Sequence, residues 1–213
     1  MKNYKHDFIE LCLQYSVLRF GDFTLKSGRQ SPYFFNAGQF NTGQALLKLG
    51  YFYATAIHSA AIEFDQLFGP AYKGIPLVTC TATALAQHYQ RDVPISFNRK
   101  TAKDHGEGGI MVGAPLQGRI LLIDDVITAG TAFRHSLELL IPFGVEIAGL
   151  VIAIDRQERG AGKLSTVKEL EQEFSIPVVS IINLNDVLSY LEADHEKRHW
   201  GNAIREYHQH YGA

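Results

Sequence analysis

The chain has few cysteines and no long apolar run. Its 213 residues include only 2 Cys, 2 Met and 1 Trp. Cys12 and Cys80 are far apart and in no CxxC pattern, so we expect two reduced thiols in a reducing compartment. No stretch approaches the roughly 20 apolar residues of a membrane span, and the acidic, amphipathic start predicts a first helix and not a signal peptide. A soluble, cytoplasmic protein without a membrane partner is expected.

A strong charge of either sign is also missing. The chain has 20 Lys and Arg against 22 Asp and Glu, a formal net charge of -2. This balance disfavours a global electrostatic attraction to nucleic acid. No GxxxxGK[ST] pattern occurs, which disfavours a nucleotide-binding P-loop protein. The apolar share of 46% is that of a globular protein.

Short apolar runs alternate with helical stretches along most of the chain. An amphipathic helix opens it, and an aromatic-rich pair of strands is predicted within residues 23–36. After a helix over about 42–62, apolar runs at 66–68, 93–97, 110–112, 120–123, 146–154 and 178–184 are separated by helices or loops. The pattern predicts an α/β fold with a central parallel sheet flanked by helices. Residues 1–40 would form a small appendage, and residues 41–213 the core with C-terminal helices, within one structural domain.

The richest local pattern is ILLIDDVITAGTA at residues 120–132. A buried strand ends in Asp124 and Asp125, and a Thr/Gly loop then enters a helix. Backbone N–H groups and hydroxyls at such a helix start suit a phosphate. Two acids beside an anion site need a compensating ligand, such as ribose hydroxyls or Mg²⁺. The alternative, acids that merely cap the helix, is disfavoured by the length of the pattern.

This segment resembles the signature by which the type I phosphoribosyltransferases bind phosphoribosyl pyrophosphate (PRPP). Four further segments, FTLKSGRQSPYFFN, GPAYKGIPL, RKTAKDHGEGG and AIDRQERG, resemble the orotate phosphoribosyltransferases in particular. The resemblance implies the fold of that family, with residues 1–40 as a hood over the base site. It also implies a Mg²⁺-dependent transfer of phosphoribosyl from PRPP to N1 of orotate, which gives orotidine 5'-phosphate and pyrophosphate in pyrimidine (UMP) biosynthesis.

The resemblance implies a role for each residue that matches the motifs. Asp124 and Asp125 would hold the ribose hydroxyls, and Asp125 would assist near the reacting nitrogen. The implied catalytic residues are Asp125, Lys103, Lys26 and His105. The implied PRPP-binding residues are Lys26, Tyr72, Lys73, Arg99, Lys100, Lys103, His105, Asp124, Asp125, Val126, Ile127, Thr128, Ala129, Gly130, Thr131 and Ala132. Mg²⁺ would be held mainly by PRPP, with Asp124 and Asp125 reaching it through water.

The implied orotate pocket combines aromatic rings with cationic groups. A flat base that carries a carboxylate calls for aromatic packing and a guanidinium group. The residues implied are Lys26, Phe34, Phe35, Thr128 and Arg156. An alternative stays open for Phe34 and Phe35, since one or both would fit the core of the predicted strands.

A basic cluster precedes the glycine-rich segment GEGG. Arg99, Lys100, Lys103 and His105 would usually form a solvated surface, but the adjacent glycines favour a lid that closes over pyrophosphate. In the family this lid reaches the neighbouring subunit's site. The resemblance therefore implies a homodimer with two composite active sites.

Three other functions are disfavoured for this chain: zinc hydrolysis, transfer to a purine, and regulation without turnover. His195 and His199 match the zinc-protease pattern HExxH, but Lys and Arg fill the intervening positions and no third ligand is near. Transfer to a purine would need a different hood. A regulatory protein that binds PRPP or RNA without turnover is disfavoured by the intact lid residues and by the net acidity.

Overall fold

A six-stranded sheet forms the centre of the computed structural model, which describes residues 4–25, 27–103, 109–160 and 162–213. In spatial order the strands are β5 (Gly109–Gly113), β4 (Ile95–Lys103), β3 (Gln66–Gly69), β6 (Arg119–Ile123), β7 (Glu146–Asp155) and β8 (Val178–Asn183). All neighbours pair in parallel except β4 and β5, which are antiparallel. The predicted α/β fold with a central parallel sheet is confirmed.

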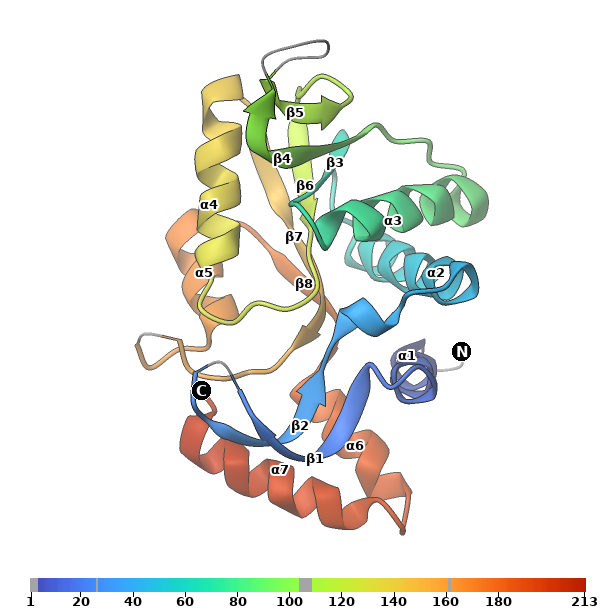
Figure 1. The fold of residues 1–213 in the computed structure, drawn as a ribbon, viewed down its shortest axis with the longest axis vertical. Helices are drawn as coiled ribbons and strands as arrows, with labels where there is room; N and C mark the ends of the chain where they lie inside the picture. The colour runs from blue at the N-terminus through green and yellow to red at the C-terminus, as the bar shows by residue number, and fades with distance from the viewer. Residues whose placement is uncertain (1–3, 26, 104–108, 161) are drawn as a thin grey trace.

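Helices cover both faces of this sheet (Figure 1). The helices of the described residues are α1 (Tyr4–Gln14), α2 (Gly43–Ala60), α3 (Gly74–Tyr89), α4 (Thr131–Leu140), α5 (Thr166–Phe174), α6 (Leu184–Ala193) and α7 (Arg198–Tyr211), with short 3-10 turns at Ala37–Gln39 and Ile141–Phe143. Of these, α7 lies away from the six-stranded sheet. Within the described ranges no helix has the length and apolar character needed to cross a membrane.

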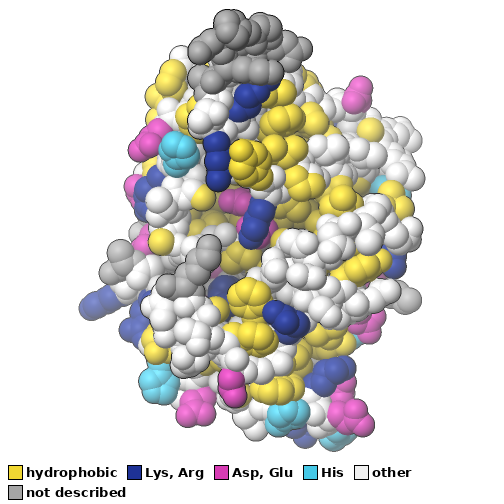
Figure 2. Space-filling view, viewed as in Figure 1, with side chains coloured by type: hydrophobic (Ala, Val, Ile, Leu, Met, Phe, Trp, Pro, Cys, Tyr) yellow, Lys and Arg dark blue, Asp and Glu magenta, His cyan; other side chains and the backbone are white. Residues whose placement is uncertain are grey.

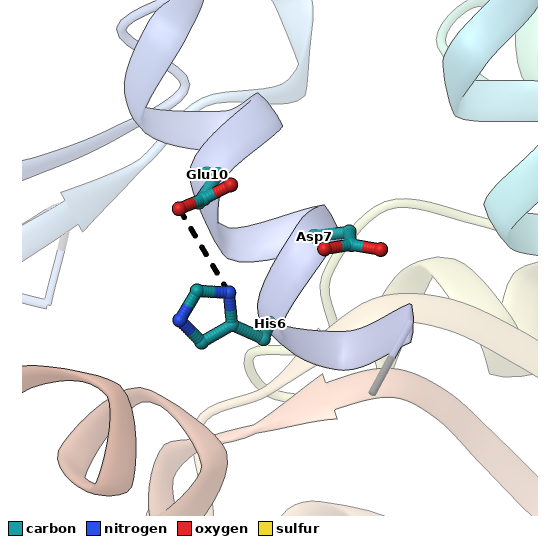
Figure 3. Close-up of side chains that lie close together, drawn as sticks. All are labelled: His6, Asp7 and Glu10. Atoms are coloured by element: carbon teal, nitrogen blue, oxygen red, sulfur yellow. Dashed lines mark ion pairs between the residues drawn. The ribbon is translucent and has the colours of Figure 1, made fainter. Parts of the chain in front are cut away.

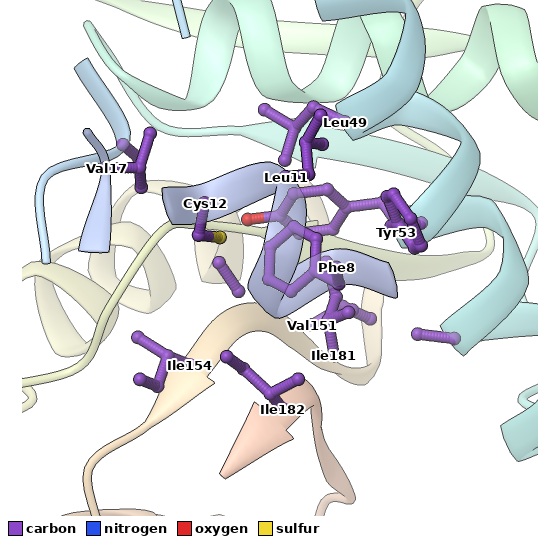
Figure 4. Packing of buried hydrophobic residues seen from close by; sticks show 14 of the residues in the cluster. Phe8, Leu11, Cys12, Val17, Leu49, Tyr53, Val151, Ile154, Ile181 and Ile182 are labelled. Carbon is purple, nitrogen blue, oxygen red and sulfur yellow. The ribbon is translucent and has the colours of Figure 1, made fainter. Parts of the chain in front are cut away.

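The sheet separates two hydrophobic clusters. On one face, Phe8, Leu49 and Tyr53 from the helices pack on Val151 and Ile182 (Figure 4). The opposite face carries a second cluster that includes Phe68, Leu122 and Leu170. Because successive strand residues point to opposite faces, β6 is buried on both sides, which explains its unbroken run of apolar residues.

A small second sheet lies beside the first. It pairs β1 (Leu18–Thr24) with β2 (Gln30–Phe35) in antiparallel fashion. The C-terminal helix α7 packs against it (Figure 1), with Trp200 stacked on Phe20 at 6.2 Å and Tyr207 edge-on to Tyr33 at 6.3 Å between ring centroids. The predicted pair of strands is present, although β1 begins at residue 18 and not at residue 23.

Strand β4 runs further than the apolar pattern indicated. Its pairing with β5 includes Asn98 with Met111 and Lys103 with Gly109. Polar residues expected in a loop therefore lie in a strand, because the hydrogen bonds of a β-ladder do not require apolar side chains.

Candidate active site

The acid pair lies at the carboxyl end of β6, between the core and the surface. The backbone N–H of Asp124 donates to the carbonyl of Val151 at 3.0 Å, and the N–H of Ala153 donates to the carbonyl of Asp125 at 2.9 Å. The buried hydroxyl of Tyr53 donates to the carbonyl of Asp124 at 2.7 Å. The backbone of both acids is thus fixed by the neighbouring strand β7 and by helix α2.

The two carboxylates have different surroundings. Asp125 accepts a charge-assisted hydrogen bond from Lys73 Nζ at 2.6 Å, and the two side chains are 10% and 62% exposed. The carboxylate of Asp124 accepts the backbone N–H of Asp125 at 2.8 Å. Burial, followed by the nearby charge of Asp125, raises the pKa of Asp124 to about 7. A ligand that supplies hydroxyl donors or positive charge would relieve this crowding.

The loop after the acid pair leads directly into α4. Gly130 precedes the helix at φ +73°, a left-handed conformation suited to glycine, and a Cβ there would lie 2.7 Å from Arg134 Nη1. Side chains from α5 and α4 hold two carbonyls of the loop. Thr166 Oγ1 donates to the carbonyl of Thr128 at 2.8 Å, and Arg134 Nη1 donates to the carbonyl of Ala129 at 3.1 Å. Gly130 is the N-cap residue of α4, and it offers no side-chain hydrogen bond to the first N–H groups of the helix. The first N–H groups of α4 are therefore suited to an anion.

The turn between β3 and α3 presents Lys73 to the acid pair. Gly69 and Gly74 pack on one another, because a Cβ on Gly69 would lie 2.2 Å from the carbonyl oxygen of Gly74. The side-chain oxygen of Asn98, on β4, accepts the N–H of Ala71 at 2.9 Å. The peptide bond between Ala71 and Tyr72 is cis. This turn is held from both sides, by its own glycines and by β4.

Basic side chains of β4 lie next to that turn. Lys100 Nζ is 4.9 Å from the ring centroid of Tyr72, which is 64% exposed. Arg99 Nη1 donates to the carbonyl of Gly109 at 3.2 Å and so links β4 to β5. In the space-filling view, Lys and Arg side chains run down this face, and acidic side chains lie beside one of them (Figure 2). The structure thus brings Tyr72, Lys73, Lys100 and Asp125 together: Lys73 contacts the carboxylate of Asp125, and Lys100 lies against the ring of Tyr72.

Three of the predicted catalytic residues are not placed. Lys26 and His105 lie outside the described residues, as does the side chain of Lys103. Their predicted roles stay predictions.

The predicted base-pocket aromatics lie on opposite faces of β2. Phe35 is 8% exposed and belongs to the hydrophobic core, so the core interpretation holds for this side chain. Phe34 instead stacks on Phe23 at 5.5 Å, with the guanidinium of Arg19 5.6 Å from the ring centroid of Phe34. Alternation along the strand gives the core one phenylalanine ring and the opposite face of β2 the other, and Phe34 alone remains available for the predicted base pocket.

Arg156 is buried and already has a partner. Its side chain is 8% exposed and lies 2.6 Å from Glu158 in an ion pair. The Tyr33 ring centroid is 4.1 Å from the guanidinium carbon. Glu158 was not among the predicted site residues, although it stands two positions after Arg156 in the segment AIDRQERG.

Tyr53 and Asn98 were likewise missed. Each acts on backbone from a different element, α2 in one case and β4 in the other. Only the packing of distant elements reveals such contacts, and a lone Tyr or Asn in the sequence carries no signal for them.

Two histidine-containing clusters lie away from this site. In the first, on the outer side of α1, His6 Nδ1 is 3.8 Å from Glu10 Oε1, and one oxygen of Asp7 lies within 4.8 Å of both side chains (Figure 3). In the HExxH match, α6 ends at Ala193 and α7 begins at Arg198, so His195 and His199 do not share a helix. His199 Nδ1 lies 2.9 Å from the carbonyl of Glu196. The HExxH match therefore does not form the two-histidine helical face of a zinc-hydrolase centre.

Comparisons with known proteins identify first the domain family of this chain and then the more specific enzyme family within it. A profile of the phosphoribosyl transferase domain matches residues 36–181, which include the acid pair and its loop. Orotate phosphoribosyltransferases of Yersinia enterocolitica and Cronobacter sakazakii are each 58% identical over 212 residues, covering 100% of this chain and 100% of each relative. The 1.9 Å crystal structure of the Francisella tularensis orotate phosphoribosyltransferase is 45% identical, with a TM-score of 0.86 over 97% of this chain and 100% of that one.

A more distant neighbour shares the fold alone. Leishmania donovani UMP synthase has a TM-score of 0.75 at 20% identity, over 97% of this chain and 42% of that protein. The full-length relatives above are decisive: this chain belongs to the orotate phosphoribosyltransferases, within the phosphoribosyltransferase family. The family predicted from its five sequence segments is confirmed.

Proposed function

We propose that this chain transfers phosphoribosyl from PRPP to N1 of orotate and releases orotidine 5'-phosphate and pyrophosphate. The observation that carries the proposal is the contact of Lys73 with Asp125 beside the loop before α4. A phosphate, a ribose and a pyrophosphate each find suitable groups within this one edge of the sheet.

The loop and the acid pair divide the binding of PRPP between them. We assign the 5-phosphate to the backbone and hydroxyls of Val126, Ile127, Thr128, Ala129, Gly130, Thr131 and Ala132. We assign the ribose 2- and 3-hydroxyls to Asp124 and Asp125, which lie directly before this loop. Hydroxyl donors would stabilise both carboxylates without adding negative charge.

The chemical step exchanges one bond at C1 of ribose for another. The C1–oxygen bond to pyrophosphate breaks through an oxocarbenium-like transition state, and N1 of orotate bonds to C1 from the opposite face as it loses its proton. We assign Asp125 to accept the proton that the reacting nitrogen loses. The cationic side chains of Lys73, Arg99 and Lys100, together with the Tyr72 hydroxyl, would meet the negative charge that grows on pyrophosphate. Lys26, Lys103 and His105 complete this set in the prediction.

The reaction is proposed to depend on Mg²⁺. The acid pair offers two carboxylates, one half-buried with a raised pKa, and such oxygen donors suit a hard divalent cation. Two carboxylates are too few for an all-protein cage, so PRPP would supply most ligands, with Asp124 and Asp125 acting through water. When bound, Mg²⁺ would neutralise pyrophosphate charge.

A homodimer is proposed, with the basic lid of each subunit serving the other subunit's site. An apolar hollow of about 450 Å³ on α2 and α3 supports it, lined by residues that include Leu46, Leu47, Ile75, Pro76 and Ala84. Leu47 is 53% exposed and Tyr51 is 41% exposed. A contiguous apolar surface of this kind is typical of an interface between subunits.

The dimer is tested by light scattering on size-exclusion chromatography. Leu47→Glu should halve the molar mass at micromolar concentration, whereas Leu164→Glu, at a leucine that is 39% exposed and lies elsewhere, should leave it unchanged. An unchanged mass for Leu47→Glu would show that this surface does not hold subunits together.

Because both cysteines are free thiols, we also propose a cytoplasmic location.

The activity is tested by the loss of orotate absorbance after PRPP and Mg²⁺ are added to purified protein. An EDTA control and parallel trials with uracil, adenine and hypoxanthine accompany it. Consumption of orotate alone, abolished by EDTA, is the expected result. Silence with all four bases, from protein that still binds PRPP, would contradict the proposed reaction and favour a regulatory protein.

A further inference from the structure

Glu158 joins three segments that are far apart in the sequence. Its Oε1 accepts hydrogen bonds from Arg156 Nε at 2.7 Å and from the Tyr207 hydroxyl on α7 at 3.1 Å. Its Oε2 accepts from Arg29 Nη1, just before β2, at 3.2 Å. The Glu158 side chain is only 15% exposed. One carboxylate thus connects the hood strand, the segment after β7 and the C-terminal helix.

Arg156 is held in a single orientation by these contacts. Its Nη2 lies 2.6 Å from Glu158 Oε1 and donates to the buried Ser31 hydroxyl at 3.2 Å. Tyr33 lies under the guanidinium plane, 4.1 Å from its carbon. In the described part of the chain the hydrogen bonds of this guanidinium run through Nε and Nη2. Its Nη1 is left for a ligand.

This arrangement solves a problem that a buried binding arginine creates. An unpaired guanidinium is costly to bury, and a mobile one loses side-chain entropy when it binds a ligand. A carboxylate on one edge compensates the charge and fixes the rotamer, while the remaining nitrogen stays free to donate.

We infer that Glu158 is a positioning residue that presents Arg156 Nη1 to the carboxylate of the base. The inference rests on the proposed function, in which Arg156 contacts orotate. It assigns α7 a part in base recognition, because Tyr207 shares the carboxylate oxygen that holds Arg156 Nε.

The test compares three variants with the parent enzyme by steady-state kinetics. Glu158→Gln keeps the shape but removes the charge, and the KM for orotate should rise about tenfold, equivalent to about 1.4 kcal/mol. The KM for PRPP should stay within twofold and kcat within threefold, since Arg156 would act on the base and not on PRPP. Tyr207→Phe removes one hydrogen bond to Oε1, and the KM for orotate should rise two- to threefold.

Arg29→Gln is the matched control. It removes the partner of Oε2, the oxygen that does not contact Arg156, so the KM for orotate should stay within twofold. A general loosening of the hood would instead raise both KM values in all three variants, and that result would overturn the positioning role. Melting temperatures measured in parallel identify a variant that fails to fold. Tyr207→Phe then decides the question, and an unchanged KM for orotate would refute the inference.

The parent enzyme separates this inference from the proposed function. If the parent consumes orotate normally and Glu158→Gln has the parent's KM for orotate, only the role of Glu158 is overturned. If the parent consumes no orotate, the proposed function fails and the role of Glu158 falls with it.

Discussion

Replacing Asp125 with asparagine tests the acid pair most directly. The substitution keeps the size of the side chain but removes the charge that lies 2.6 Å from Lys73 Nζ. Because the Lys73 side chain is 62% exposed, loss of this ion pair should cost at most about 1 kcal/mol of unfolding free energy. The same change removes the repulsion that contributes to the raised pKa of Asp124. These effects oppose each other, so the melting temperature should shift by no more than about 2–4 °C.

Turnover should fall far more than stability. A preorganised charged group that acts in the transition state is typically worth about 2.7–4 kcal/mol, or roughly 10²–10³ in rate. The assay is the initial rate of orotate absorbance loss at saturating PRPP and Mg²⁺, with the melting temperature measured on the same preparation.

Asp65→Asn is the control for this prediction. Asp65 pairs with Arg119 at 3.0 Å, where Arg119 begins β6 at the opposite end of the strand from the acid pair. Its loss should leave turnover within threefold of the parent. If Asp125→Asn is folded and also turns over within threefold, Asp125 has no part in the mechanism.

Three further predictions concern the acid pair, its loop and the lid. The raised pKa of Asp124 means that this side chain keeps a proton in the folded state which it loses in the unfolded state, so its contribution to stability should fall as the pH rises from about 4 to 7. The difference between the urea midpoints of Asp124→Asn and the parent should therefore change across that range, and a constant difference would contradict the prediction. Gly130→Ala would place a Cβ at φ +73° and 2.7 Å from Arg134 Nη1. The variant should lose about 1 kcal/mol or more of unfolding free energy and should bind PRPP less tightly in a calorimetric titration. Parent-like values of both quantities would show that the loop tolerates a side chain. Lys103→Ala should lower turnover about 10²–10³ and leave the KM for orotate within threefold; turnover within threefold of the parent would refute the lid hypothesis.

The acid pair and its loop could be predicted because the parts are consecutive in the chain. A buried strand, two acids, a glycine-containing loop and a helix follow one another from residue 119 to 140. The local geometry of a strand that leads into a helix is sufficient to predict a phosphate site there. The alternation of strands and helices likewise predicts a parallel sheet, since parallel neighbours need a crossover connection.

Contacts between distant segments were beyond such reasoning. The side of β2 that faces the core is decided by packing, which places Phe35 in the large hydrophobic cluster and leaves Phe34 stacked on Phe23. The HExxH pattern fails because α6 ends before His195, and that end depends on how α6 and α7 pack. The residue types along one helix or strand do not show which other element will bury each of its faces.

The sequence by itself determined the class of fold, the family and the loop that joins the acid pair to α4, because each depends on residues that are neighbours along the chain. Tertiary structure alone decided how Lys73 reaches Asp125, how Tyr53 holds the acid pair, and how Glu158 and α7 fix Arg156. The contacts of Lys73 with Asp125, Tyr53 with Asp124, and Tyr207 and Arg29 with Glu158 each join residues between 49 and 129 positions apart. Polar groups that the packed sheet and helices remove from water need partners to offset the cost of burial, and only the tertiary structure brings those partners within reach.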